Sequence, residues 1–229
     1  MSGISDWIAN KKKIYGELVK KSQCIECLLK ELEIKAKNFH FENTDKTFQL
    51  RRTLDVHLPI KTEHLWERLI TSIMPEDTFF NQFSFNKTNN IDMVKITEQK
   101  LICELIELKT GSNEISHACY EILFYYLLLL RAKEEDKMID RTYKIDDNIT
   151  LIVLAPGYYL KTDYQNDFFK QFKKIVTKKY SIKFEFIPLP HSDKKCELKD
   201  MTDDLCNKIS DGEIKSISQD LQDYFLKKL

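Results

Sequence analysis

Residues 91–109 read IDMVKITEQKLICELIELK, and this stretch decides the fold of the chain. Two apolar runs are separated by the polar tripeptide 98–100, a pattern typical of two strands joined by a tight turn. Asp92 lies near the start of the first run and Glu107 near the end of the second, so the two acids are expected to converge on neighbouring strands. Lys109 follows Glu107 by two residues and points to the same face of the sheet, because side-chain direction repeats every two residues.

Further helices and strands are expected on both sides of this hairpin. The order along the chain is one helix, three meandering strands, and then two helix–strand units. That order predicts an α/β fold, a mixed central sheet flanked by helices. The expected helices cover residues 63–73, 114–133 and 163–180, and the expected strands cover residues 79–85, 91–96, 101–108, 149–155 and 182–187.

Two additions flank the predicted core. Residues 1–58 are expected to form an N-terminal helix, from Asp6 to Lys37, and then a strand-like hairpin. Residues 59–190 hold the α/β core. Residues 191–229 form a polar C-terminal helical tail of one or two helices.

The composition excludes several classes of protein. The 229 residues include 36 basic and 36 acidic side chains, so no global field draws the protein onto nucleic acid. The sequence lacks a phosphate loop, a dinucleotide-binding glycine fingerprint and a Gly-x-Ser-x-Gly elbow, which argues against nucleotide hydrolases, Rossmann enzymes and serine hydrolases. Residues 1–13 are polar and do not resemble a secretory signal, and the longest apolar run is too short to span a membrane. A cytoplasmic protein with no membrane partner is expected.

Asp92, Glu107 and Lys109 together have the chemistry of a phosphodiester-hydrolysing site. A phosphodiester repels nucleophiles, so its hydrolysis benefits from a metal cation that bridges the phosphate and the attacking water. Mg²⁺ prefers oxygen ligands and usually takes one or two protein carboxylates, which Asp92 and Glu107 supply. Lys109 is suited to orient or deprotonate the water, or to stabilise charge on the phosphate. The alternative is a solvated Glu–Lys pair, but charges at the end of an apolar strand are costly unless they are paired or bound to metal.

This arrangement resembles the PD-(D/E)XK nuclease superfamily, which includes restriction endonucleases, junction resolvases and RecB-type exonuclease domains. Those proteins share a helix, a three-stranded meander, a helix and a further strand, with an Asp on the second strand and a Glu-x-Lys on the third. Asp92, Glu107 and Lys109 match these positions, whereas Ile91 stands where the family has Pro. The resemblance covers residues 63–187. It implies a restriction-endonuclease-like core in which the two acids bind Mg²⁺, or Mn²⁺ in its place, and the lysine assists the attacking water.

Two helices add residues to the site that the resemblance implies. Some members of the superfamily place a Glu on the first helix near the metal; Glu67 is the expected counterpart here and Glu63 the alternative. A solvated helix face is the other interpretation of both. RecB-type members carry a Gln followed four residues later by a Tyr on the next helix. Glu121 and Tyr125 have that spacing, with Glu in place of Gln; otherwise Tyr125 is a core aromatic residue.

The sequence therefore predicts a Mg²⁺-dependent nuclease with Asp92, Glu107, Lys109 and Glu67 as catalytic residues and the first two as metal ligands. The expected partner and substrate is nucleic acid, specifically DNA. RNA is left open, because the metal site does not distinguish ribose from deoxyribose. A role in defence or DNA processing is expected by analogy alone. The alternative is a catalytically inactive nuclease-fold protein that acts as a nucleic-acid-binding or assembly module. A homodimer or a protein partner is left open in both cases.

A basic stripe is predicted on one side of the helix expected at 163–180. Lys170, Lys173, Lys174 and Lys178 lie on it. Such a stripe can follow a phosphate backbone and make binding sensitive to salt. A solvated outer face is the other interpretation, and it is the one that the sequence alone favours.

Overall fold

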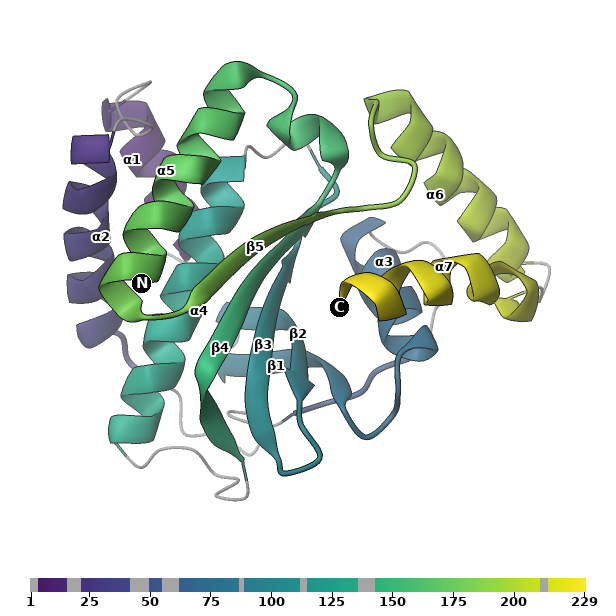
Figure 1. Cartoon of the computed structure of the whole chain (residues 1–229), viewed down its shortest axis with the longest axis horizontal. Coiled ribbons are helices and arrows are strands. Elements are labelled where there is room, and N and C mark those ends of the chain that lie inside the picture. Colours follow the sequence, from purple (N-terminus) through teal and green to yellow (C-terminus); the bar gives the residue numbers. More distant parts are fainter. Residues whose placement is uncertain are drawn as a thin grey trace.

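The alternating apolar runs form the strands of one five-stranded mixed sheet, and helices cover both of its faces (Figure 1). The computed structural model describes residues 4–15, 22–41, 50–54, 62–86, 89–111, 115–135, 143–210 and 214–229. The elements in chain order are α1 (Ile4–Tyr15), α2 (Ser22–Lys37), α3 (Thr62–Ile73), β1 (Phe79–Asn86), β2 (Asn89–Ile96), β3 (Leu101–Leu108), α4 (Ile115–Glu134), β4 (Lys144–Ala155), the 3-10 helix η2 (Gly157–Leu160), α5 (Asp163–Tyr180), β5 (Lys183–Pro188), α6 (Lys195–Ser210) and α7 (Ile214–Lys228).

The strands lie in the sheet in sequence order, β1-β2-β3-β4-β5. The first three form an antiparallel meander, because only short turns join them. β3, β4 and β5 are parallel, and the helices α4 and α5 make the two crossovers between them. The predicted α/β class and the mixed sheet flanked by helices are thereby confirmed.

Two hydrophobic clusters lie on opposite faces of the sheet. The first packs α1, α2, α4 and α5 against one face, and its centre is α4, most of whose side chains are buried. The second packs α3, α6 and α7 against the other face (Figure 1). Thus both terminal additions cover the sheet rather than extend from it. Among the described residues, no helix is long and apolar enough to cross a membrane.

Strand β1 changes the face that it presents to the core. Phe79 belongs to the cluster under α3, whereas Phe83 and Phe85 belong to the cluster under α4. Gln82 lies between them with φ of 65°, a left-handed conformation that interrupts the regular pleat. The change of face leaves the polar side chain of Asn81 buried in the sheet near α3.

The N-terminal part differs from its prediction. In place of one helix from Asp6 to Lys37, the structure has α1 and α2, and residues 16–21 between them lie outside the described part. The predicted hairpin after residue 38 falls partly outside it as well. Its described residues, 38–41 and 50–54, form no strand; only Arg51 makes an isolated bridge, to Asn81. Aromatic side chains there pack onto the core from a loop, with Phe39 edge-on to Phe124.

Helix α6 is joined to α3 through a buried hydrogen bond. The indole of Trp66, fully buried, donates to Thr202 Oγ1 at 3.2 Å, and that hydroxyl donates in turn to the carbonyl of Leu198 at 2.7 Å. We expect Thr202→Val, which keeps the side-chain volume, to lower the free energy of unfolding by about 1–2 kcal/mol, because the indole N–H is left without an acceptor. Urea unfolding measures the change, with the exposed neighbour Asp203→Asn as the control. An unchanged midpoint in Thr202→Val would show that the bond contributes nothing.

Candidate active site at the end of the central strands

The register of β2 and β3 brings the two predicted metal ligands together. Met93 pairs with Ile106 and Val94 with Leu105, so Asp92 lies opposite Glu107, one residue beyond the last pair. Asp92 Oδ2 accepts a hydrogen bond from the backbone N–H of Leu108 at 2.8 Å, which ties its carboxylate to the end of β3. The two acids are thus neighbours in space although fifteen residues separate them in sequence.

Lys109 lies on the same face as Glu107, as the two-residue spacing predicts. Its backbone N–H donates to the carbonyl of Leu154 at 2.9 Å, so the extended pairing with β4 continues just past the end of β3. Its ammonium lies 2.5 Å from Glu107 Oε1. Both side chains are buried, with exposed fractions of 7% for Lys109 and 1% for Glu107. Such burial is costly for charges, and the pairing offsets the cost.

Helix α4 contributes a second carboxylate to Lys109. Glu121 Oε2 lies 3.1 Å from the ammonium, and Glu121 Oε1 accepts a hydrogen bond from the Tyr125 hydroxyl at 3.2 Å. His117 Nε2 lies 3.5 Å from Glu121 Oε2. The three α4 residues follow one another at intervals of four, which places them on one side of the helix. The structure therefore places Glu121 beside Lys109 and the Tyr125 hydroxyl on Glu121.

The two candidates on α3 take different positions. The Glu67 side chain is buried near Asp92, whose charge acts on it, and within the described part of the chain Glu67 Oε1 has no hydrogen-bond partner. Glu63 lies one turn earlier, half-buried, and its Oε1 accepts a hydrogen bond from the backbone N–H of Thr110 at 3.3 Å. Both carboxyl groups thus interact with the charge of Asp92, and Glu63 also holds the segment that follows Lys109.

The acids of the site are hard to ionise together. Burial raises the pKa of Asp92 to about 6, against the opposing effects of Lys109 and the Leu108 N–H. Burial, and then the charge of Asp92, raise the pKa of Glu67 to about 8 and that of Glu107 well above its ordinary value. Burial also raises the pKa of Glu121, but Lys109 and His117 outweigh it and leave that pKa lowered.

The lysine responds in the opposite way to the acids. Burial lowers the pKa of Lys109, but the charges of Glu107, Glu121 and Asp92 outweigh burial and hold it well above its ordinary value. Lys109 is therefore an ammonium at neutral pH. In that form it can orient a water or stabilise negative charge.

Two further residues complete the site, and no motif in the sequence pointed to either. Tyr159, in η2, donates from its hydroxyl to the carbonyl of Gly111 at 2.6 Å and so fixes the chain beyond Lys109. Asn81 hydrogen-bonds the side chain of Glu67 and, with its own amide, both the N–H and the carbonyl of Thr53. Only the fold shows these contacts, because the residues come from distant parts of the chain.

The donor set suits a hard cation held partly by water. Among the described residues, no group of three or more His, Cys, Asp or Glu side chains is arranged as a metal cluster. Asp92 and Glu107 nevertheless provide the two carboxylates that Mg²⁺ commonly takes, with waters filling the other positions. Glu107 Oε2 is buried and, in the described part of the chain, lacks a hydrogen-bond partner. A cation beside these acids would satisfy that oxygen and offset their mutual repulsion.

Comparisons with protein-family models, with curated proteins and with solved structures gave no match to this chain. The geometry of the site and the order of the strands therefore carry the functional argument.

Proposed function

We propose that this protein is a Mg²⁺-dependent nuclease of the PD-(D/E)XK type that hydrolyses phosphodiester bonds in DNA. The observation that carries the proposal is the meeting of Asp92, Glu107 and Lys109 at one end of β2 and β3. The order of elements supports the proposal as well. A meander of three strands is followed by α4 and the parallel strand β4, which is the order in the PD-(D/E)XK core that the sequence resembles.

In the proposed reaction, water attacks phosphorus, the bond to the leaving oxygen breaks, and the water proton passes to solvent. Mg²⁺ bound to Asp92 and Glu107 would supply Lewis-acid activation of the water and the phosphate. The Lys109 ammonium holds the attacking water or a phosphate oxygen and stabilises the negative charge of the transition state. Glu121 and Tyr125 position the ammonium, since Glu121 binds it from α4 while the Tyr125 hydroxyl orients Glu121.

A binding or assembly module without catalysis is the second candidate, and a specific contact favours it. Lys109 lies between Glu107 and Glu121 at 2.5 and 3.1 Å, so both carboxylates already have a protein cation as partner without a metal. The two candidates differ in one property: only the nuclease requires Asp92 and Glu107 to bind a cation.

The deciding experiment combines DNA cleavage with metal binding. Supercoiled, linear and single-stranded DNA, and a matched RNA, are incubated with the protein in Mg²⁺, Mn²⁺ or EDTA, while calorimetry measures Mg²⁺ binding. We expect metal-dependent cleavage of DNA by the wild type, and loss of the calorimetric signal in Asp92→Asn, which keeps the hydrogen bond to Leu108. A wild type that neither binds Mg²⁺ nor cleaves any substrate would support the binding module instead.

A further inference from the structure

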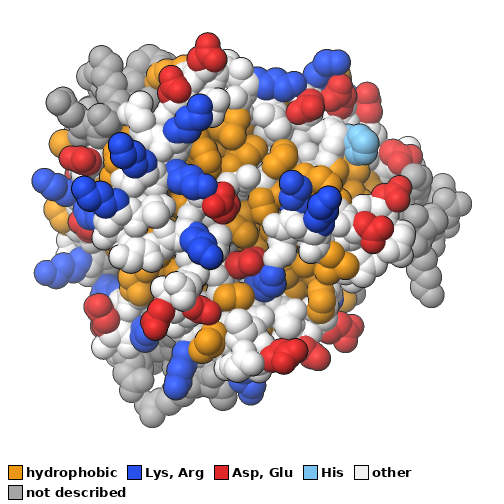
Figure 2. Space-filling model, viewed as in Figure 1, with side chains coloured by type: hydrophobic (Ala, Val, Ile, Leu, Met, Phe, Trp, Pro, Cys, Tyr) orange, Lys and Arg blue, Asp and Glu red, His pale blue; other side chains and the backbone are white. Residues whose placement is uncertain are grey.

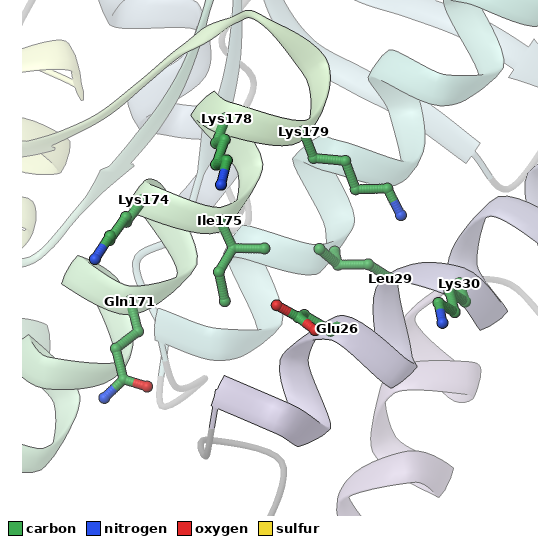
Figure 3. A pocket seen from close by; sticks show the side chains of 8 residues that line it. All are labelled: Glu26, Leu29, Lys30, Gln171, Lys174, Ile175, Lys178 and Lys179. Atoms are coloured by element: carbon green, nitrogen blue, oxygen red, sulfur yellow. The ribbon is translucent and has the colours of Figure 1, made fainter.

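Helices α2 and α5 pack against each other and leave a groove of about 780 Å³ at their outer surface. Ile175 of α5, half-buried, is the apolar side chain at its floor, and Leu29 of α2 lies fully buried beneath; Figure 3 shows both between the helices. Glu26 is the only acid among the lining residues. The groove is separate from the candidate active site, to which none of these residues belongs.

Lysines from both helices make the groove positive. Lys30 comes from α2, and Lys174, Lys178 and Lys179 come from α5. Lys179 pairs with Glu33 at 2.9 Å, whereas the other three have no ion-pair partner within the part of the chain that the structure describes. The chain as a whole is neutral, so this charge is a local concentration. Figure 2 shows blue side chains gathered over α5 and α2. A polyanion is complementary to such a surface.

The basic stripe of the sequence is divided by the fold. Lys174 and Lys178 line the groove, but Lys173 pairs with Glu185 of β5 at 2.8 Å, and Lys170 is not part of the lining. Lys174 and Lys178 are one helical turn apart, about 6 Å along the axis of α5. Lys174 and Lys178 therefore form a row along the groove. Lys170 and Lys173, on the same helix, lie outside it and can serve as controls.

Helix α5 connects the groove to the candidate site. It begins beside η2, where Tyr159 bonds to Gly111, just beyond Lys109. Lys174 lies eleven residues after Asp163, the first residue of α5, which corresponds to about 16 Å along the helix. A single strand that keeps the stacked spacing of duplex DNA, about 3.4 Å per nucleotide, covers that length with roughly five nucleotides.

We propose that the groove between α2 and α5 binds the phosphate backbone of a single nucleic-acid strand that extends from the candidate active site. The inference rests on the proposed function: the groove would hold the part of the nucleic-acid substrate that lies outside the reaction centre. Lys30, Lys174 and Lys178 bind the phosphates, and the partly exposed Ile175 contacts a sugar. Binding of this kind is independent of base sequence and weakens as salt rises.

The test is the salt dependence of binding to labelled oligothymidylate in EDTA, where no metal-dependent cleavage interferes. We expect Lys174→Gln/Lys178→Gln to weaken binding of a strand of about 30 nucleotides roughly tenfold at low salt, and to reduce the slope of log K against log salt by about 1.4, or 0.7 for each lost contact. The matched control, Lys170→Gln/Lys173→Gln, removes the same charge from the same helix outside the groove and leaves the affinity close to that of the wild type.

Three outcomes overturn the inference: no binding by the wild type, equal losses in the two double variants, or an unchanged salt slope in Lys174→Gln/Lys178→Gln. The proposed function is judged separately by cleavage. If the wild type cleaves DNA but the groove variant binds normally, the groove inference fails and the nuclease stands. If the wild type binds through the groove but cleaves nothing, the inference stands and catalysis fails.

Discussion

Lys109→Met is expected to lower the rate of metal-dependent DNA cleavage by about 10²- to 10³-fold, the range seen when one preorganised stabiliser of the transition state is removed. Methionine keeps an unbranched side chain of similar length but carries no charge. The ammonium of Lys109 lies within reach of Glu107 and Glu121, and its pKa is held high, so its contribution is electrostatic. Initial rates of plasmid nicking at saturating Mg²⁺ measure the loss.

A matched lysine separates this effect from a loss of folding. Lys95 of β2 also pairs with a carboxylate of the sheet, Glu104, at 3.3 Å, but away from the candidate site. Lys95→Met should therefore leave the nicking rate within about twofold of the wild type, since surface and part-buried pairs contribute little. Thermal unfolding is followed for both variants. A folded Lys109→Met protein that nicks DNA as fast as the wild type would remove Lys109 from the reaction.

The sheet was predictable because its strands are encoded locally. Residues 101–108 were predicted as a strand and form β3 with those bounds, since a mostly apolar run, broken only by Glu104 and Glu107, lies between two polar turns. The strand β4 was predicted to start at Ile149 but starts at Lys144. Polar Asp146 and Asp147 concealed its first part, because pairing of Leu101 with Lys144 and of Ile102 with Ile145 supplies the stabilisation there. Local pattern cannot show such pairing.

The sequence could predict only those parts of the site whose positions follow from the regular pairing of strands. Asp92 and Glu107 were expected to converge because two strands joined by a tight turn must pair, and the register bears this out. The choice between Glu63 and Glu67 was not decidable in that way. Both lie on the same side of α3, one turn apart, and the depth of each in the fold depends on how α3 packs against β1 and β2. Tyr159 gave no sequence signal, because its role is a contact between the segments that follow the neighbouring strands β3 and β4.

Glu67→Gln is expected to stabilise the metal-free protein at high pH and to have little effect at low pH. In the unfolded chain a Glu ionises near pH 4.3, whereas burial and Asp92 raise the pKa of Glu67 to about 8 in the folded protein. Between these values the folded state holds a proton that the unfolded state has lost, so the free energy of unfolding falls as pH rises through this window. Glutamine cannot ionise and removes that loss.

The expected gain of Glu67→Gln over the wild type in EDTA is on the order of 5 kcal/mol at pH 8.5 and less than about 1 kcal/mol near pH 4.5, since one pKa unit corresponds to about 1.4 kcal/mol. Urea unfolding across the pH range measures both curves, with Glu134→Gln, at the exposed end of α4, as the control. Parallel curves for Glu67→Gln and the wild type would show that Glu67 is not held protonated. A gap that opens as pH rises and closes at low pH would instead show that the folded, metal-free protein holds Glu67 protonated and that its ionisation beside Asp92 is unfavourable.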